Sequence, residues 1–519
     1  MKYIVSILPV ILTSYFTSAQ DIATCRYLLD IEKHTEARAC LQKSLSANPG
    51  NAQTHYLLGE SYLLKSSPDS ARAFFSNGIE QSPKSGINYV GLGKADYPSD
   101  KEKAEASFNK ALELGKNKDI AVITELAAFY LENKQMDKAL NVLNPFLKKE
   151  TNNPQLYLLA GDAYLQKNDG NQALEYYERK ALPLNQNLPV TYLKIGRLYS
   201  RTRNYEMAMQ YYNKAIEKDP NYSPAHKEIA EVYFKAGLYK KAIAAYEKYL
   251  TIADKDADSD FRYASFIFMN KDYETALTLL NSLTAKQTDN FLLYRLMAYS
   301  YYETGQTDKG LENMNIFFSK AKPENYLSSD YEYLAKLYGK KGDRENAIAN
   351  FEKALAISQD NYDLYIELGN LHFLNKDFDK AAAAYEGKLT KTQGKPNDYL
   401  NYGKMLYYQE NFVKADSVFS LLSQLIPQLP HGYLWKAKAL EQMDTDADIG
   451  KAQSAYERFI ETSSGEPEKY KSDLIKAYSY LGALYSQKDE VEKSASAWKK
   501  VQELDPANSN AKEALKNYR

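Results

Sequence analysis

The sequence predicts an all-α protein built as a solenoid of about fourteen helix-turn-helix repeats. Three observations lead to this prediction. The chain repeats itself with a period of about 34 residues, small and large residues recur at fixed places within each period, and polar or Gly-containing turns separate the helical segments. One helix pair cannot bury both of its faces alone, so we expect successive pairs to stack on one another.

Residues 1–19 are predicted to be a secretory signal peptide. An apolar stretch follows Lys2, and the small residues 17–19 precede the expected cut, so the mature chain should start near Gln20. A lipid anchor would need a cysteine directly after the apolar stretch, and Cys25 comes too late.

Most periods contain a small residue in the first helix, a second small residue twelve positions later and a large residue four positions after that; the third unit is one residue shorter, and the thirteenth has a longer turn. Gly196, Ala208 and Tyr212 form one such set. Facing small residues let two antiparallel helices approach closely, and the large side chain fills the gap beside them. Fourteen units follow this pattern, with their first small places at Cys25, Gly59, Gly93, Ala127, Gly161, Gly196, Ala230, Ala264, Ala298, Ala335, Gly369, Gly403, Ala437 and Gly482.

Irregular spacing suggests how the array is divided. We expect repeats 1–9 in residues 20–327, repeats 10–14 in residues 328–508 and a capping helix in residues 509–519. A three-residue excess near residues 322–329 marks the division, and a longer irregularity precedes the fourteenth unit. We expect these irregular stretches, residues 322–329 and 461–473, to be points of flexing.

Composition restricts the kinds of partner. The chain has 66 Lys and Arg against 67 Asp and Glu, and the two signs are interspersed. A nucleic-acid-binding protein needs a basic stripe to pair with phosphates, so no nucleic-acid partner is expected. Beyond the first twenty residues no apolar run approaches the ~20 residues of a membrane helix, so no integral span is expected. The unusual number is that of tyrosine, 46, and many tyrosines fall at repeated core places.

These spacings resemble those of the tetratricopeptide repeat family, over residues 20–508. The resemblance implies a right-handed superhelix whose concave surface is lined by first helices, at places one, four and five after the first small residue and three before it. Arginine beside exposed aromatic rings on that face would suit an extended, partly acidic protein segment. The alternative is that the same residues pack between repeats. The expected partner-binding residues are Arg197, Arg201, Phe234, Phe261, Phe268, Arg295, Tyr299 and Tyr302.

No motif for a nucleophile, a phosphate loop or a paired-histidine metal site occurs, so no catalytic, cofactor or metal site is expected. Two acidic runs, residues 254–260 and 444–448, are similar to partial calcium loops but lack the closing glutamate. Solvated turns are the preferred interpretation of both. His55, His226 and His372 occupy places where other units carry tyrosine, which indicates packing.

The two cysteines lie on the inward stripes of the first unit's two helices. Antiparallel helices packed this closely can bring the Cα atoms of Cys25 and Cys40 within disulfide range, and an oxidising compartment would let the bond form. Two buried free thiols are the alternative.

The sequence therefore predicts a non-enzymatic interaction scaffold that binds a partner segment in its concave groove, in the periplasm or at the outer membrane. Two alternatives stay open. The first is a subunit of a polysaccharide-export, secretion or surface-attachment machine that contacts glycan or outer membrane. The second is an enzyme whose site the sequence does not disclose.

Overall fold

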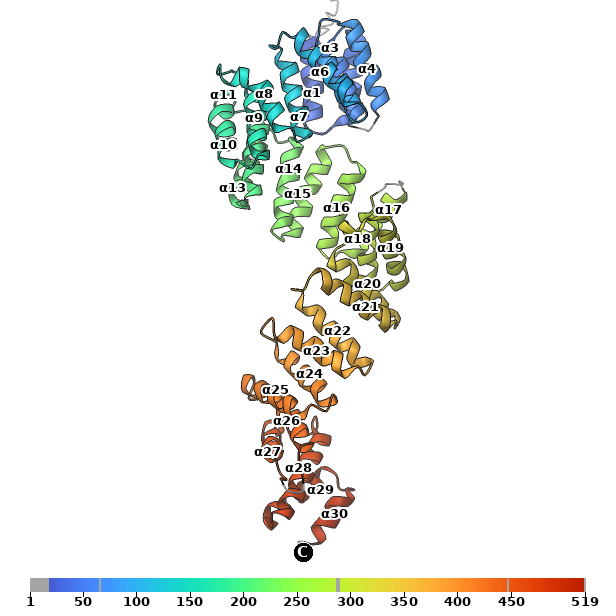
Figure 1. The fold of residues 1–519 in the computed structure, drawn as a ribbon, viewed down its shortest axis with the longest axis vertical. Helices are drawn as coiled ribbons and strands as arrows, with labels where there is room; N and C mark the ends of the chain where they lie inside the picture. The colour runs from blue at the N-terminus through green and yellow to red at the C-terminus, as the bar shows by residue number, and fades with distance from the viewer. Residues whose placement is uncertain (1–17, 65–66, 286–289, 446–447, 518–519) are drawn as a thin grey trace, which may run out of the picture. The chain divides into compact units, whose positions relative to one another are not determined.

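The computed structural model describes residues 18–64, 67–285, 290–445 and 448–517. These residues form fourteen antiparallel helix pairs and a final single helix, and they contain no β-strand. The predicted all-α solenoid is confirmed. The chain separates into two compact units, unit 1 (Met1–Thr288) and unit 2 (Asp289–Arg519), which Figure 1 shows in blue to green and in yellow to red. No helix among the described residues is long and apolar enough to cross a membrane.

Unit 1 contains the first eight repeats, and each repeat is one pair of helices. The fifth repeat is irregular because its second half consists of two short helices joined by a π-helical turn. The elements are α1 (Ser18–Asp30), α2 (His34–Ala47), α3 (Ala52–Leu63), α4 (Pro68–Gln81), α5 (Ile87–Asp96), α6 (Lys101–Leu114), α7 (Ile120–Glu132), α8 (Met136–Leu147), α9 (Pro154–Gln166), α10 (Gly170–Leu174), η1 (Glu175–Ala181), α11 (Leu182–Leu184), α12 (Pro189–Arg201), α13 (Tyr205–Lys218), α14 (Ser223–Lys235), α15 (Tyr239–Ile252), α16 (Ala257–Met269) and α17 (Tyr273–Ala285).

Unit 2 contains the remaining six repeats and the final helix. The elements are α18 (Leu292–Glu303), α19 (Thr307–Lys320), the short 3-10 helix η2 (Pro323–Asn325), α20 (Ser328–Lys341), α21 (Arg344–Ile357), α22 (Tyr362–Leu374), α23 (Phe378–Leu389), α24 (Pro396–Tyr408), α25 (Phe412–Leu425), α26 (Pro430–Glu441), α27 (Gln453–Ser463), α28 (Lys471–Gln487), α29 (Val491–Leu504) and α30 (Ser509–Lys516). Helix α30 covers the last pair through Ala511, which packs near Trp498 and Val501.

The two helices of a repeat are held together by the predicted small–large contact. A Cβ atom built on Gly161 would lie 2.3 Å from Cε1 of Tyr177, and one built on Gly403 would lie 2.4 Å from Cε1 of Phe419. Both distances are far inside van der Waals contact, so the large ring occupies the space that the missing side chain leaves.

The turn inside a repeat commonly ends on a residue in the left-handed region. Gly237, Gly305 and Gly342 have φ values of +72°, +76° and +84°, and Lys134 and Arg203 hold this conformation without being glycine. A left-handed residue ends a helix by redirecting its last carbonyl groups. This geometry lets the second helix start after only a few residues.

One extra residue in the fifth repeat is absorbed by the π-helical turn. The first small places Gly161 and Gly196 are 35 residues apart instead of about 34. The π-helix η1 widens the backbone ring to hold the extra residue, so Tyr177 stays completely buried.

The division between the units differs from the expected one. The two units meet at residues 288/289, between the eighth and ninth repeats, and the sequence suggested residues 327/328. The segment 322–329, which contains the three extra residues, packs against the neighbouring helices. The Tyr326 hydroxyl donates to the carbonyls of Phe318 and Ala321 at 3.0 and 3.2 Å, and its ring packs on Phe317, Phe318 and Tyr331. The second stretch, residues 461–473, is anchored by the buried Tyr470, whose ring meets Phe459 edge-on at 5.9 Å.

The predicted signal peptide lies outside the described residues except for its end. Ser18 and Ala19 are the first residues of α1, so a cut before Gln20 would fall in the first turn of that helix.

The first repeat of unit 1 closes onto the seventh. The Ser223 hydroxyl, which is fully buried at the start of α14, donates to the carbonyl of Ile31 at 2.7 Å. The Glu32 carbonyl accepts from the Asp254 amide at 3.0 Å, and the Asp254 carboxylate accepts from the Thr35 amide at 2.7 Å. We call this set the closing contact. It is completed by Tyr249, whose hydroxyl donates to the Glu32 carboxylate at 2.7 Å.

Candidate protein-binding groove

The inside of unit 1 holds a continuous groove lined by first helices and by the segments that precede them. Three hollows, of about 520, 520 and 290 Å³, all include Gln155 in their walls, so they are parts of one interior surface. We call it the inner groove. Helices α1, α7, α9 and α12 form its walls, and the closing contact brings α1 to the side of the later repeats.

The middle part of the inner groove combines an apolar floor with a charged rim. Ala128 and Leu131 of α7 and Leu159 and Leu165 of α9 form the floor. Leu131 and Leu159 are buried and Ala128 and Leu165 are half-buried, so the apolar area open to a partner comes mainly from the latter two. Apolar area flanked by charges of both signs is typical of surfaces that hold protein segments. The charged rim consists of Glu132, Asp162, Lys194, Arg197 and Arg201.

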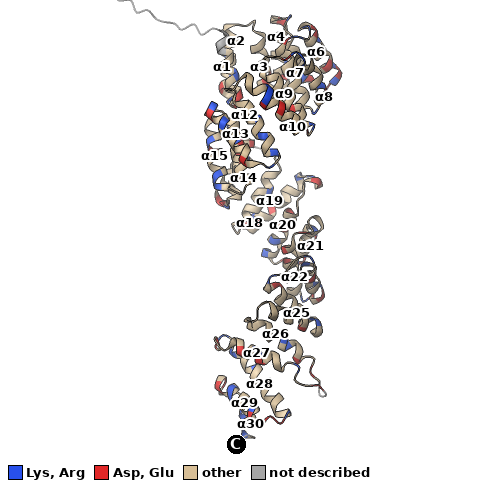
Figure 2. Cartoon of the chain, turned by 90° about the vertical axis from the view of Figure 1, so that its left-hand side faces the viewer, with Lys and Arg blue, Asp and Glu red and all other residues tan. Residues whose placement is uncertain are grey.

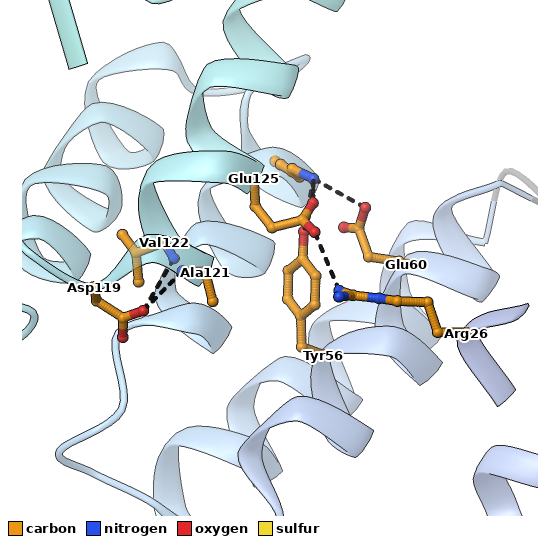
Figure 3. Close-up of polar contacts among 8 residues, drawn as sticks. Arg26, Tyr56, Glu60, Asp119, Ala121, Val122 and Glu125 are labelled. Carbon is orange, nitrogen blue, oxygen red and sulfur yellow. Dashed lines mark hydrogen bonds and ion pairs between the residues drawn. The ribbon is translucent and has the colours of Figure 1, made fainter. Parts of the chain in front are cut away.

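A network of charges stiffens the wall formed by the first four repeats (Figure 3). Lys94 is nearly buried, and its Nζ lies 2.7 Å from the Tyr56 hydroxyl, 3.0 Å from a Glu60 oxygen and 3.3 Å from a Glu125 oxygen. Arg26 of α1 approaches the other Glu125 oxygen at 3.6 Å. Burial by itself would lower the pKa of Lys94, but the carboxylates of Glu60 and Glu125 outweigh it and raise the pKa. The lysine therefore stays charged and ties α3, α5 and α7 together.

Asp30 is a carboxylate of the inner groove that lies near its first-repeat end. It lines two of the hollows, and the described residues give it no hydrogen bond or ion pair. The surrounding protein raises the pKa of Asp30 to about 6, against the weaker opposing effect of Arg26. Asp30 is exposed in the groove, so its carboxylate is accessible to a ligand.

Buried tyrosines position some of the groove's polar groups. The ring of Tyr177 is completely buried, and its hydroxyl donates to Asp162 at 2.6 Å. Asp162 also accepts from Lys194 at 2.5 Å. The equivalent Tyr385 and Tyr456 of unit 2 donate to Asn370 and Glu441 at 2.7 and 2.5 Å. This arrangement accounts for part of the tyrosine content, because a phenylalanine would fill the core without reaching the concave side.

Two of the predicted partner-binding residues line the inner groove. Arg197 is exposed and donates to Glu228 at 2.7 Å. Arg201 is exposed as well, and its guanidinium donates to the Leu165 carbonyl at 2.9 Å and to the Asn168 side chain. Both are held in place by neutral or acidic groups and still present part of the guanidinium to the groove.

The predicted phenylalanines of unit 1 are half-buried on α14 and α16. Phe234 stacks on Phe266 at 4.9 Å and lies under the Arg262 guanidinium, and Phe268 packs against Tyr273 at 5.4 Å. Phe261 is half-buried on α16. None of the three lines the hollows that share Gln155.

The predicted residues of unit 2 are committed to packing, which corrects their interpretation as exposed groove residues. Arg295 donates to both carboxylate oxygens of the fully buried Asp330, at 2.7 and 2.8 Å. Tyr299 is buried, donates to Asp330 at 2.6 Å and stacks on Tyr333 at 3.9 Å. Tyr302 lies edge-on to Tyr333 and under Lys340. The periodicity predicted exposed side chains here, but it carried no sign of the buried Asp330 carboxylate that Arg295 and Tyr299 contact.

The sequence interpretation missed the residues of the first and fifth repeats that line the groove. Arg26 and Asp30 lie one and five places after Cys25, so the family's concave places would have found them. No aromatic side chain stands beside them at these concave places, unlike Arg295 with Tyr299. Asn153 and Leu188 belong to segments between repeats, for which the periodicity gives no rule.

The histidines and the first acidic run noted in the sequence include residues with hydrogen-bond partners inside the protein. His55 and His226 make the same contact, with Nε2 2.9 Å from the carbonyls of Pro49 and Pro220. Asp256 caps α16 by accepting from the Ser259 amide at 2.7 Å. Within the described part of the chain, no cluster of His, Cys, Asp and Glu could hold a metal ion. The structure joins Cys25 and Cys40 by a disulfide, with 5.5 Å between their Cα atoms.

Comparison with known proteins gives consistent results. Sequence profiles of the tetratricopeptide repeat match residues 24–85, 154–179, 193–260 and 340–392. The YpiA protein of Bacillus subtilis, a TPR repeat-containing protein, is 26% identical over 243 residues, which cover 45% of this chain and 56% of that protein. A Drosophila melanogaster homologue of the BBSome complex member BBS4 is 21% identical over 52% of this chain and 58% of that protein. The chain thus spans a little over half the length of these two relatives.

One solved structure has a higher sequence identity to this chain than these two relatives. It is the C-terminal part of a TPR repeat-containing protein from Cytophaga hutchinsonii, 33% identical, and it covers 49% of this chain and 99% of the solved chain with a TM-score of 0.43. The identity over nearly all of that solved chain, with the matched profiles, shows that this chain belongs to the tetratricopeptide repeat family.

Proposed function

We propose that the protein is a non-enzymatic scaffold that binds an extended segment of a partner protein in the inner groove of unit 1. Proteins of this family generally mediate protein–protein interaction through concave surfaces. The observation that carries the proposal is the continuity of the groove, in which three hollows meet at Gln155 between an apolar floor and a charged rim.

The groove's chemistry favours a segment with alternating apolar and polar side chains. The half-buried Ala128 and Leu165 offer apolar area, while Arg197 and Arg201 offer guanidinium groups that can pair with a carboxylate. Asp30 at the other end offers a carboxylate for a basic or hydrogen-bonding group. An extended segment can meet these groups in succession, whereas a folded domain is too wide for hollows of about 520 Å³.

We further propose that the protein works outside the cytoplasm, in the periplasm or associated with the outer membrane. Two features support this location: the apolar N-terminal stretch of signal-peptide type, and a cysteine pair placed so that an oxidising compartment would bond it. Fusion of alkaline phosphatase to Arg519 tests it, because that enzyme is active only after export. Activity that stays at the level of a fusion lacking residues 1–19 would refute the location.

Photo-crosslinking tests the groove. A benzoylphenylalanine at Gln155 should cross-link a partner protein in living cells, and the same group at the exposed Asn213 of α13 should not. Arg197→Ala/Arg201→Ala should reduce the yield at Gln155 by at least about fivefold, a loss of about 1 kcal/mol in binding. Arg179→Ala, whose arginine pairs with Glu175 on the π-helical turn, is the matched control.

Equal yields from Gln155 and Asn213 would refute the groove as the binding site. Cross-linking of polysaccharide instead of protein would replace the proposal by the alternative of a glycan-handling machine.

A further inference from the structure

Unit 2 carries a group of aromatic rings around one tryptophan. Trp435 of α26 is half-buried, and Tyr407 and Tyr408 of α24 meet it edge-on at 5.4 and 6.1 Å. Tyr408 is 42% exposed and also packs on Phe373 and Phe378, each at 5.5 Å. We call these five residues the aromatic platform. It is fixed by its own ring contacts and keeps part of its apolar area open.

Two lysines lie over the central ring. Nζ of Lys404 is 5.1 Å from the centre of the Trp435 ring, and Nζ of Lys438 is 4.9 Å from it. Lys438 is neutralised by Asp473 at 2.9 Å. For Lys404, the described residues show no carboxylate and no hydrogen-bond acceptor within contact distance. A cation over an aromatic face is attracted by the ring, but the ring does not neutralise its charge.

A comparison of equivalent places singles out Lys404. Lys404 directly follows the first small residue of its repeat, and five other repeats also carry a basic residue at this place. In the described chain each of those five pairs with a carboxylate at 3.6 Å or less: Arg26 with Glu125, Lys94 with Glu60, Arg197 with Glu228, Lys336 with Glu332 and Lys438 with Asp473.

The surroundings of Lys404 disfavour its positive charge, while no acid among the described residues compensates for it. Partial burial lowers the pKa of Lys404, and nearby Lys438 lowers it further. Burial also lowers the pKa of His431 on α26, with Lys404 and Lys469 adding to the effect, so this histidine is neutral at pH 7. A partly desolvated cation without an acid gains most from an incoming anion.

We propose that Lys404 and the aromatic platform form a second binding site, which takes an acidic segment of a partner protein. A carboxylate of that segment pairs with Lys404, and an aliphatic or aromatic side chain next to it covers Trp435 and Tyr408. The site differs from the inner groove in its unit and in its chemistry, because its cation lies over an aromatic ring, whereas Arg197 of the inner groove pairs with Glu228 and Arg201 bonds to neutral oxygen atoms. It also gives the scaffold a second, independent point of attachment.

Tryptophan fluorescence tests this assignment directly. The chain has two tryptophans, so Trp498→Phe leaves Trp435 as the only reporter. The probe is a short peptide with two Asp-Leu-Asp-Phe blocks, compared with a peptide that carries Asn in place of Asp. The acidic peptide should change the Trp435 emission saturably, and the Asn peptide should bind at least about tenfold more weakly.

Matched variants locate the charge that matters. Lys404→Gln should weaken binding of the acidic peptide by about tenfold. Lys436→Gln removes a lysine of the neighbouring helix that lies 3.9 Å from Asp416, and it should leave binding unchanged. If Trp498→Phe does not fold, fluorotryptophan NMR of the unmodified chain reports on both indoles and serves the same comparison.

Three results would overturn the proposal. The first is equal binding of the Asp and Asn peptides, the second is equal behaviour of Lys404→Gln and Lys436→Gln, and the third is no response to the acidic peptide at millimolar concentration. Alginate that saturates Trp435 while the peptide does not would assign the site to an anionic glycan. Arg197→Ala/Arg201→Ala should leave the Trp435 response unchanged, so a failure of this site is distinguishable from a failure of the inner groove.

Discussion

Asp330 shows how single polar side chains hold neighbouring repeats together. Its carboxylate is fully buried and accepts hydrogen bonds from the Arg295 guanidinium, from the Tyr299 hydroxyl and, at 2.7 Å, from the Leu327 amide. Arg295 also donates to the Asn325 carbonyl and lies over the Phe317 ring. These contacts link α18 to η2 and α20, so the extra residues between the ninth and tenth repeats are held by a buried acid.

Arg295→Ala should lower the free energy of unfolding of unit 2 by about 3 kcal/mol or more, because it leaves the buried Asp330 carboxylate without its cation. Urea denaturation measures the loss. Adding Asp330→Asn should recover part of it, since the unpaired charge is then gone. The exposed Arg344→Ala on α21 is the control. Equal midpoints for Arg295→Ala and Arg344→Ala would show that the pair contributes nothing.

Asp30 gives a prediction with a pH dependence. Burial in the protein raises its folded-state pKa to about 6, above the ordinary aspartate value of 3.8, so the folded state binds this proton more tightly than the unfolded state does. The free energy of unfolding therefore falls as pH rises from about 4 to 6, and Asp30→Asn removes that fall. Since Asp30 retains solvent contact, screening should limit the effect to about 1 kcal/mol.

Thermal unfolding at pH 4.5 and 7.5 checks the Asp30 prediction. Asp30→Asn should stabilise the chain more at pH 7.5 than at pH 4.5. A difference between variant and parent that is the same at both pH values would mean that Asp30 titrates normally.

At the scale of the helix pair, the small–large contact determines how closely two helices approach. Two helical glycines allow a matched test, because Gly403 faces Phe419 whereas a Cβ on Gly339 would meet nothing within 4 Å. Gly403→Ala should destabilise unit 2 by about 1–3 kcal/mol through overpacking. Gly339→Ala should stabilise it by about 0.5–1 kcal/mol, since alanine is the better helix former. Urea midpoints that move in the same direction would refute the contact.

The first helix pair carries a covalent link between its helices. The Cys25–Cys40 bond closes a sequence separation of 15 residues, so Cys25→Ala/Cys40→Ala should lower the stability of unit 1 by about 3 kcal/mol. Mass spectrometry of the exported protein, alkylated under denaturing but non-reducing conditions, shows whether the bond forms. Alkylation of both thiols would refute it.

The sequence was sufficient for the helix pairs and insufficient for much of the groove, and the reason is physical. The contact of Gly161 with Tyr177 is encoded within one period, so its spacing is visible in the chain. The pairing of Arg295 with Asp330 depends on how a three-residue excess folds between two repeats. The local pattern places Arg26 and Asp30 on the concave side, but the contact of the first repeat with the seventh joins residues 192 positions apart, and no local pattern encodes it.

At the scale of the whole molecule, the charges are interspersed over both units (Figure 2), so specificity has to come from individual uncompensated groups. Unit 1 adds a feature that a linear array lacks. In such an array each repeat is stabilised only by its neighbours. Here the first repeat also forms hydrogen bonds with the seventh, through Ser223, Tyr249 and Asp254.

Deleting residues 18–50 should therefore destabilise α14 and α15 as well as the adjacent α3 and α4. Hydrogen exchange should show lower protection in residues 223–252, because the deletion removes the Ile31 and Glu32 carbonyls and the Glu32 carboxylate. Deleting α30 is the control, and its effect should stay within the last repeat. Unchanged protection of α14 and α15 would show that unit 1 behaves as a linear array.

The closing contact also fixes when unit 1 can finish folding. Ile31 and its hydrogen-bond partner Ser223 are 192 residues apart, and a chain is synthesised from its N-terminus. The first repeat therefore has its near neighbour early but lacks its far partner until the seventh repeat has emerged. During that interval Ile31, which is 3% exposed in the finished protein, has no apolar cover from α14. A solenoid can mature repeat by repeat, whereas the closing contact of unit 1 can form only after the seventh repeat has been synthesised.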